Sequence, residues 1–163
     1  MGDVEAVVSG VEDLGVVETF AAFYGRTYAS SVRLAYSLVD RREIAEEIAQ
    51  DAYAALYDRF EQVRDPAAYV RRSVVNGCRR VHRRRALARR RLLPRADDAT
   101  DIGYNHLLEA VWRLPARQRA VVVLRYEAGL GIDDIATTLD IPVGSVKSAL
   151  ARARSRLRKE LEP

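Results

Sequence analysis

The sequence is poor in the residues that build disulfides, metal sites and catalytic centres. Cys78 is the only cysteine in 163 residues, so neither an internal disulfide nor a cysteine-based zinc site can form. The two histidines, His82 and His106, are isolated from one another and from the acidic residues. A helical nuclease would need clustered carboxylates or histidines for metal or general-base work. We therefore expect no metal, no cofactor, no small-molecule substrate and no catalytic activity.

Long apolar runs and a basic N-terminal segment are also missing. No apolar stretch reaches the roughly 20 residues that cross a bilayer. The opening residues, "MGDVEAVVSGVEDLG", are acidic, whereas a secretory signal starts with a basic segment. Together with the lone cysteine, these absences predict a cytoplasmic protein that does not insert into a membrane.

Lysine is rare, although the chain is basic. It carries 27 Lys+Arg against 23 Asp+Glu, for a net charge of +4, and only Lys147 and Lys159 are lysines. Arginine has a planar fork of donors that matches the oxygens of a phosphate. The composition therefore favours a phosphate-bearing partner.

Composition and periodicity divide the chain into two helical parts, with no internal repeat and no convincing strand. The segment "AVVVLRY" (120–126) could form a short β-strand, but its context favours a buried helix. We predict an all-α fold of two small helical domains joined by a flexible linker. The expected parts are an acidic arm (1–16), a helical domain (17–85), a linker with Pro94 and Gly103 (86–103) and a second helical domain (104–163).

The C-terminal part has the pattern of a helix-turn-helix. Apolar residues within 132–139 share one helix face, and Pro142 cannot continue that helix because it lacks an N–H donor. Asp140 lies where a tight turn needs a left-handed backbone, which aspartate tolerates better than most residues. A second helix is expected from about Val143, with arginines on its outer face and an apolar stripe at Val146, Leu150, Ala153, Leu157 and Leu161. Two helices joined in this way, the second of them basic, are typical of DNA-binding proteins.

An αα-hairpin with a solvated arginine-rich face would give part of the same pattern. Two details favour the helix-turn-helix. Small Ala136, the turn residue Asp140 and Ile141 at the corner occur together. The first turns of the second helix also carry short or flexible polar side chains that can approach a groove, at Ser145, Lys147 and Ser148.

The N-terminal part begins with an acidic helix. Within 42–60 we expect one buried face, made of Ile44, Ile48, Ala52, Ala55 and Leu56. The outer surface is then acidic, with Glu43, Glu46, Glu47, Gln50 and Asp51. Asp65 is expected to cap the next helix, which starts at Pro66 and buries Val70, Val74, Gly77 and Val81.

A basic stripe is expected on the outer side of that second helix. Its members recur at spacings of 4, 3 and 4, at Arg72, Asn76, Arg79 and Arg83. No acidic residue occurs from Pro66 to Ala96, and an unneutralised arginine stripe repels itself unless it meets an anion. Its length suits a nucleic-acid backbone, and Asn76 has the donor and acceptor to read a base edge. In a simpler interpretation, Asn76 only separates the charges.

These segments resemble a known family. Residues 17–161 are similar to bacterial sigma factors of the sigma-70 class, specifically the small extracytoplasmic-function (ECF) type. "LVDRREIAEEIAQDAYAALYDRF" and "DPAAYVRRSVVNGCRRVHRRR" resemble the domain that binds the polymerase clamp and opens the minus-10 element. "LPARQRAVVVLRY" and "IPVGSVKSALARARSRL" resemble the domain that reads the minus-35 element. The resemblance implies a factor that binds core RNA polymerase and promoter DNA, often under the control of an anti-sigma factor.

The resemblance also implies roles for individual residues. Lys147, Ser148 and Arg152 match positions that face the minus-35 major groove, and Ser145 matches one near the DNA backbone. Asn76 matches a polar position beside the minus-10 element, to which we assign its whole stripe. The loop that captures an unstacked base there is matched by Phe60, Glu61, Gln62, Val63, Arg64 and Asp65. The surface that docks on the coiled coil of the clamp is matched by Glu47, Gln50 and Asp51.

The chain departs from the family pattern at a few positions. Ala149 stands where arginine is common, so we expect one DNA contact to be missing. Tyr57 and Tyr69 stand where tryptophans are common, and their smaller rings are expected still to stack. Gly131 replaces the usual serine cap, which costs only a few tenths of a kcal/mol, roughly.

The alternative function is that of a stand-alone helix-turn-helix regulator. Such a protein usually adds a dimerisation or ligand-sensing domain. Here the other half carries an arginine stripe and an acidic face, with no obvious pocket, so the sigma-factor interpretation is favoured.

The length of the expected linker limits what the free chain can reach. The 18 residues of 86–103 span roughly 21–25 Å as a relaxed coil and roughly 60 Å when fully extended. The family's two promoter elements lie about 50 Å apart, or about one and a half duplex turns. A relaxed linker is too short, so we expect polymerase to hold the domains apart.

Overall fold

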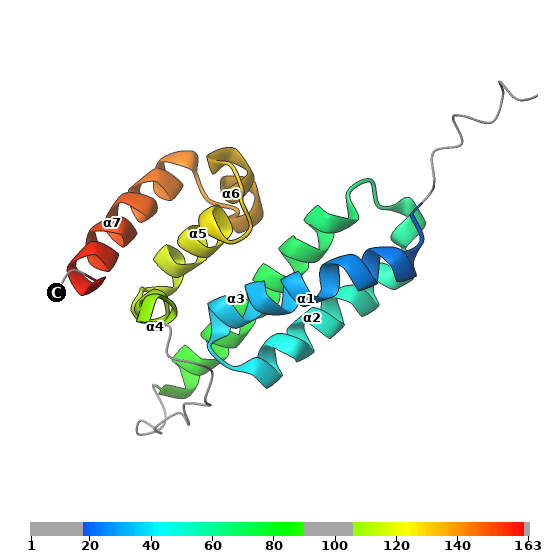
Figure 1. Ribbon diagram of the computed structural model, residues 1–163, viewed down its shortest axis with the longest axis horizontal. Coiled ribbons are helices and arrows are strands. Elements are labelled where there is room, and N and C mark those ends of the chain that lie inside the picture. Colours follow the sequence, from blue (N-terminus) through cyan, green and yellow to red (C-terminus); the bar gives the residue numbers. More distant parts are fainter. Residues whose placement is uncertain (1–17, 90–105, 162–163) are drawn as a thin grey trace, which may run out of the picture.

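The protein is built from α-helices, as predicted. The computed structural model describes residues 18–89 and 106–161, and within these ranges it has no strand. The elements in chain order are α1 (Phe20–Val39), α2 (Arg42–Tyr57), the short 3-10 helix η2 (Phe60–Gln62), α3 (Pro66–Arg89), α4 (His106–Arg113), α5 (Ala116–Tyr126), α6 (Ile132–Leu139) and α7 (Val143–Leu161). Figure 1 shows α1, α2 and α3 side by side in an elongated bundle, with α4 to α7 gathered next to it. Over the described ranges, no helix combines the length and apolar character needed to cross a membrane.

Helix α2 shows how the first domain forms its core. It turns six residues into the bundle, namely Ala45, Ile48, Ala49, Ala52, Tyr53 and Leu56. The predicted burial of Ile48, Ala52 and Leu56 is confirmed, and Ile44 is half-buried. The prediction for Ala55 is wrong, because this residue is exposed. At 100° per residue it lies about a quarter turn from the centre of the buried stripe.

Helix α3 starts as predicted and ends later than predicted. The Asp65 Oδ1 atom accepts a hydrogen bond from the Ala68 N–H at 2.9 Å, which caps the helix ahead of Pro66. The helix continues to Arg89, four residues past the expected boundary at 85, because "ALAR" (86–89) contains neither proline nor glycine. The expected arm (1–16) and the remainder of the expected linker (90–103) lie outside the described residues.

A hydroxyl network lies inside the first domain. The Tyr53 side chain is only 2% exposed. Its hydroxyl donates to Thr27 Oγ1 at 2.7 Å and lies 3.0 Å from Ser31 Oγ. Thr27 in turn donates to the Phe23 carbonyl at 2.6 Å. Because every member has a partner, the phenol can be buried without an unsatisfied polar atom.

The second domain confirms the predicted helix-turn-helix. The segment 120–126 lies in helix α5, so the strand alternative is wrong. Asp140 ends α6 in the left-handed conformation, with φ 53°, and α7 begins at Val143. In the apolar stripe of α7, Val146, Leu150 and Ala153 are buried, Leu157 is half-buried and Leu161 is exposed. The stripe therefore serves the core over its first three turns and reaches solvent at its end.

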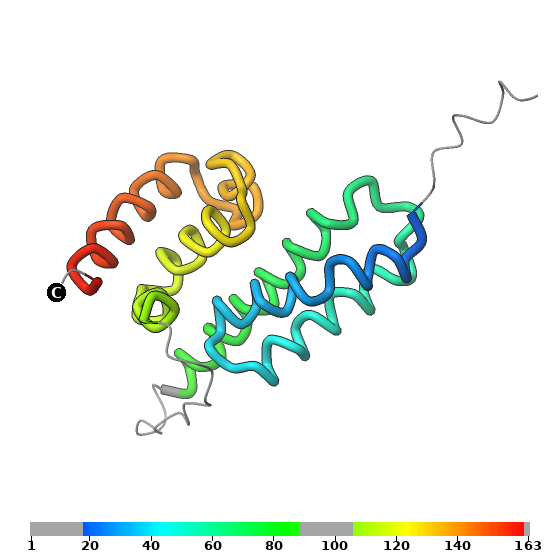
Figure 2. Tube along the Cα trace, in the orientation of Figure 1, coloured from blue at the N-terminus to red at the C-terminus, as the bar shows by residue number. Residues whose placement is uncertain are grey.

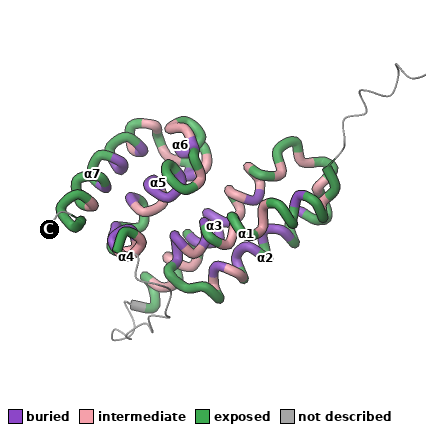
Figure 3. Tube along the Cα trace, viewed as in Figure 1, coloured by how far each residue is buried: buried purple, intermediate pink, exposed green. Residues whose placement is uncertain are grey.

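The two domains pack against each other. Helix α1 contacts α4 and α5, and helix α3 contacts α6. The chain trace in Figure 2 places α5 and α6 beside α3, and Figure 3 shows buried positions on both sides of this boundary. The Trp112 Nε1–H donates to the Tyr36 carbonyl at 3.3 Å, and the two rings meet edge to face at 5.2 Å. This arrangement was not predicted, since the sequence was interpreted as two domains on a flexible linker.

The crossing of α2 and α3 depends on Gly77. A Cβ atom at this position would lie 2.7 Å from Cγ2 of Ile48, which is closer than real Cβ contacts allow. We predict that Gly77→Ala lowers the free energy of unfolding by about 0.5–2 kcal/mol, because overpacking outweighs the gain in helix propensity. Gly25→Ala is the matched control, since a Cβ there has no neighbour within 4 Å. It should stabilise the protein by about 0.5–1 kcal/mol. Urea denaturation of both variants measures this, and a stabilising Gly77→Ala would contradict the packing.

Candidate nucleic-acid interface

The turn between α6 and α7 sets the direction of the basic helix. The N–H of Asp140 donates to the carbonyls of Ala136 and Thr137, and the Ile141 N–H donates to the Ala136 carbonyl at 3.0 Å. The Pro142 carbonyl then accepts from Ser145 N–H at 2.9 Å and so starts α7. Ile141 is half-buried at the corner. The chain thus reverses within three residues and presents α7 on the outside of the domain.

The predicted minus-35 residues lie on the outer side of α7. Lys147, Ser148 and Arg152 are exposed, and Ser145 is half-buried at the start of the helix. Ala149 is 5% exposed and belongs to the core, so this position faces inward in the protein. The outer side of the helix is therefore polar. It carries short serine side chains near its N-terminus and cationic side chains further along, which suits entry into a groove.

The stripe of Arg72, Asn76, Arg79 and Arg83 runs along α3, but the structure divides it. Arg72, Arg79 and Arg83 are exposed and Asn76 is half-buried. The Arg79 guanidinium donates to the carbonyl of Leu139 in α6, at 3.0 Å. One member of the stripe is thus engaged by the second domain.

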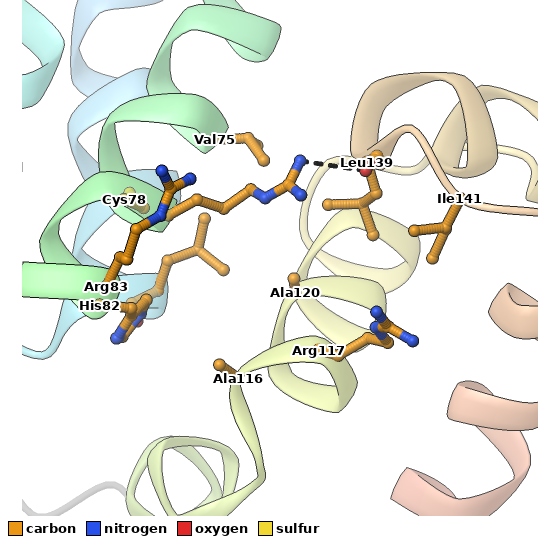
Figure 4. Close-up of a pocket in the computed structure, with 11 residues that line it drawn as sticks. Val75, Cys78, His82, Arg83, Ala116, Arg117, Ala120, Leu139 and Ile141 are labelled. Atoms are coloured by element: carbon orange, nitrogen blue, oxygen red, sulfur yellow. Dashed lines mark hydrogen bonds between the residues drawn. The ribbon is translucent and has the colours of Figure 1, made fainter. Parts of the chain in front are cut away.

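A cavity of about 300 Å³ separates α3 from α5 and α6 next to this contact. Figure 4 shows Cys78, His82 and Arg83 on one side and Ala116, Ala120 and Leu139 on the other. Burial raises the pKa of the Cys78 thiol to about 12. Burial also lowers the pKa of His82 below its ordinary value. The cavity is therefore lined by an unreactive thiol and by cationic or neutral groups, and no carboxylate is among its described lining residues.

The loop 60–65 also has two kinds of residue. Phe60 packs at 5.5–5.6 Å from the rings of Phe20 and Phe23, Val63 is half-buried, and Asp65 caps α3. Glu61, Gln62 and Arg64 are exposed. The packed and capping residues therefore hold the loop in place, whereas the exposed Glu61, Gln62 and Arg64 can reach a nucleotide.

An exposed aromatic ring lies beside that loop. Tyr57 is 65% exposed and meets Phe20 edge to face at 5.0 Å, while Phe20 in turn contacts Phe60. Tyr69 is half-buried against the core. Of the two tyrosines expected to stack, only Tyr57 therefore offers an open ring.

The predicted docking residues lie together on α2. Glu47, Gln50 and Asp51 are all exposed. They follow one another on the outer side of the helix, and none of them forms an ion pair with another described residue. Helix α2 therefore presents a polar, acidic face that DNA phosphates would repel.

The residues that join the domains were not predicted from the sequence. Arg119 on α5 donates to the carbonyl of Leu38 on α1 at 2.9 Å, and burial lowers its pKa. Arg119 lies one helical turn before Val122 and Val123, which are both buried. An arginine on the same helix face as buried valines was therefore the sequence feature that could have revealed its role. No cluster of His, Cys, Asp or Glu suited to a metal occurs within residues 18–89 and 106–161.

The family models and relatives give a consistent identity. Residues 23–90 match the model of sigma-70 region 2, and residues 105–157 match that of sigma-70, region 4. The chain is 33% identical to the RNA polymerase sigma-E factor of Streptomyces coelicolor, covering 91% of this chain and 89% of that one. It is 32% identical to the ECF RNA polymerase sigma factor SigM of Mycobacterium tuberculosis, covering 87% and 76%.

Solved structures show the same fold. The sigma factor RpoE of Bartonella quintana, crystallised with the anti-sigma factor NepR, has a TM-score of 0.72 and 19% identity, covering 88% of this chain and 96% of that one. CnrH, in complex with the cytosolic domain of CnrY, has a TM-score of 0.64 and 22% identity, covering 88% and 87%. With regions 2 and 4 both matched and most of each relative covered, the chain belongs to the sigma-70 family, as an ECF sigma factor for promoter-directed initiation by RNA polymerase.

Proposed function

We propose that the two domains divide promoter recognition between them. The first domain (α1–α3) docks on the polymerase clamp through Glu47, Gln50 and Asp51 and reads the minus-10 element. The second domain (α4–α7) reads the minus-35 element through the outer side of α7. The observation that carries this proposal is the presence of two polar, cationic helix surfaces on separate domains. A stand-alone helix-turn-helix regulator needs only one.

At the minus-35 element, α7 would enter the major groove with its N-terminal turns. Ser145 and Ser148 are short enough to let the helix backbone approach, and Lys147 supplies a flexible charge. Arg152 lies about two turns into the helix, where its fork can bind a guanine at O6 and N7 or hold a phosphate. Ala149 is buried in the core and takes no part in reading bases.

At the minus-10 element, α3 and the loop 60–65 would act together. Arg72 and Arg83 neutralise phosphates along the strand, and Asn76 lies between them. An unstacked base needs a π-face and hydrogen-bonding groups. Tyr57 offers the first, and the exposed Glu61, Gln62 and Arg64 offer the second.

The chain supplies recognition, and the chemistry of RNA synthesis belongs to the polymerase. We also propose that the protein acts in the cytoplasm, because RNA polymerase works there. Structures of similar fold were solved with the anti-sigma factor NepR and with a cytosolic domain of CnrY. We therefore also propose that an anti-sigma partner controls this chain.

Run-off transcription with purified core RNA polymerase and a library of upstream sequences tests the proposal. We expect initiation only when the chain is added, at templates that share two sequence elements. A chain that binds DNA but neither binds core polymerase nor supports initiation would instead be a stand-alone regulator.

Arg152→Ala tests the minus-35 surface. The side chain is exposed, so folding stability should stay the same while binding to the preferred promoter weakens by about 1–3 kcal/mol. Arg117→Ala removes the same charge from an exposed position on α5 and is the control. Fluorescence anisotropy with the promoter and with single-base variants measures both effects. Equal binding by Arg152→Ala and Arg117→Ala would remove Arg152 from the site.

Charge reversal tests the docking surface. The double variant Glu47→Arg and Asp51→Arg should lose binding to core polymerase, because a basic or polar partner surface would then face like charge. The control, Asp58→Arg with Glu127→Arg, makes the same change of charge at two other exposed positions. Pull-down of core polymerase and anisotropy with minus-35 duplex are measured on each preparation. Undiminished polymerase binding by the first double variant would move the docking surface elsewhere.

A further inference from the structure

The last two carbonyls of α1, those of Leu38 and Val39, accept hydrogen bonds from side chains of other helices. The last carbonyls of a helix carry partial negative charge, yet α1 has no basic residue in its last turn. Donors from two other helices, α3 and α5, take its place. The Leu38 carbonyl accepts from His82 Nε2 at 2.8 Å and from Arg119 at 2.9 Å. The Val39 carbonyl accepts from Arg85 at 3.0 Å.

Among these donors, Arg119 forms hydrogen bonds to both domains. One terminal nitrogen of its guanidinium donates to Leu38 in the first domain. The other donates to the carbonyls of Trp112 and Leu114 at the end of α4, in its own domain. A planar fork can hold carbonyls on two sides at once, whereas the single head of a lysine cannot fix the same geometry.

The contact that Arg119 holds covers part of the minus-10 surface. With the domains together, the Arg79 guanidinium is engaged by the Leu139 carbonyl, and α5 and α6 lie across the cavity from His82 and Arg83 (Figure 4). A DNA strand that follows the stripe on α3 would have to displace α6. The closed arrangement and full use of the stripe are therefore mutually exclusive.

We propose that Arg119 is a latch that keeps the free chain closed and keeps Arg79, in the middle of the basic stripe, engaged by the second domain until the domains separate. This inference rests on the proposed function of α3 in minus-10 binding. The apparent affinity for the minus-10 strand is then the intrinsic affinity reduced by the open fraction. Losing a hydrogen bond from a charged donor should raise the open-to-closed ratio about tenfold or more.

Energy transfer between labels on the two domains tests the latch directly. Donor and acceptor dyes are attached to Ala54→Cys on α2 and Ser155→Cys on α7, both at exposed positions. The native Cys78 is 2% exposed, and burial raises its pKa to about 12. The dyes should therefore react with the introduced cysteines and not with Cys78. Arg119→Ala should lower the transfer efficiency of the full chain. Arg117→Ala is an equal loss of charge two residues away and should leave it unchanged, because Arg117 lines the same cavity but donates no hydrogen bond to the described residues of the first domain.

A second variant covers the case in which Arg119→Ala disturbs its own domain. Tyr36→Ala removes the ring that Trp112 contacts across the boundary, from the side of the first domain. It should also lower the transfer efficiency, while circular dichroism and thermal melting show that both domains remain folded. Unchanged efficiency in folded Arg119→Ala, or in Tyr36→Ala if Arg119→Ala does not fold, would overturn the latch.

A binding measurement separates the latch from the function on which it rests. A single-stranded minus-10 oligonucleotide, taken from a promoter that the chain uses in run-off transcription, should bind Arg119→Ala more tightly than the native chain, by about the same factor of ten or more if the native chain is mostly closed. Opening without tighter binding would show that the latch exists but does not shield a DNA site, and would overturn the shielding. If neither form bound while opening was seen, the proposed role of α3 would fail and the latch itself would stand.

Discussion

The structure depends on how the carbonyl end of α1 is satisfied. Asp40 ends the helix in the left-handed conformation, with φ 60°, and its carboxylate lies 3.0 Å from the Arg85 guanidinium. The open carbonyls then attract donors from α3, α4 and α5. Because buried backbone carbonyls need partners, this one end fixes the tail of α3 and also brings the second domain against the first. The bundle and the domain contact therefore share the same few atoms.

This arrangement places two demands on the chain that conflict. Reading two promoter elements requires the domains to stand apart, yet the contacts of Arg79, Trp112 and Arg119 hold them together. The extension of α3 to Arg89 increases the conflict, because a helical residue advances about 1.5 Å and an extended one about 3.3 Å. Core polymerase resolves it if docking through α2 contributes more free energy than the closed contact. Recognition of DNA is then coupled to assembly with the enzyme.

The sequence predicted local structure better than it predicted the contact between domains. The left-handed Asp140, the Asp65 cap and the restart at Val143 follow from turn and capping preferences that act over a few residues, and all three are present. Ala55 was wrongly assigned to the core. Alanine occurs both in cores and on surfaces, so only the exact rotation of α2 about its axis decides whether this residue is buried. The roles of Arg79 and Arg119 could not be predicted, since their partners are backbone carbonyls 60 and 81 residues away, which have no side-chain signature. For the same reason, the polar surfaces of α2, α3 and α7 could be predicted from the sequence. The contact between the domains, which engages part of the α3 surface, could not.

The most direct test of this account is promoter binding as a function of spacer length, with and without core RNA polymerase. Promoters that differ only in the distance between the minus-35 and minus-10 elements are titrated with the free chain and with the assembled holoenzyme. A closed chain engages one element at a time, so the free chain should bind weakly and equally well across the series. The holoenzyme should bind tightly at one spacing and lose affinity when the spacer is lengthened or shortened. Strong spacing dependence in the free chain would show that its domains already stand apart, and would contradict the account.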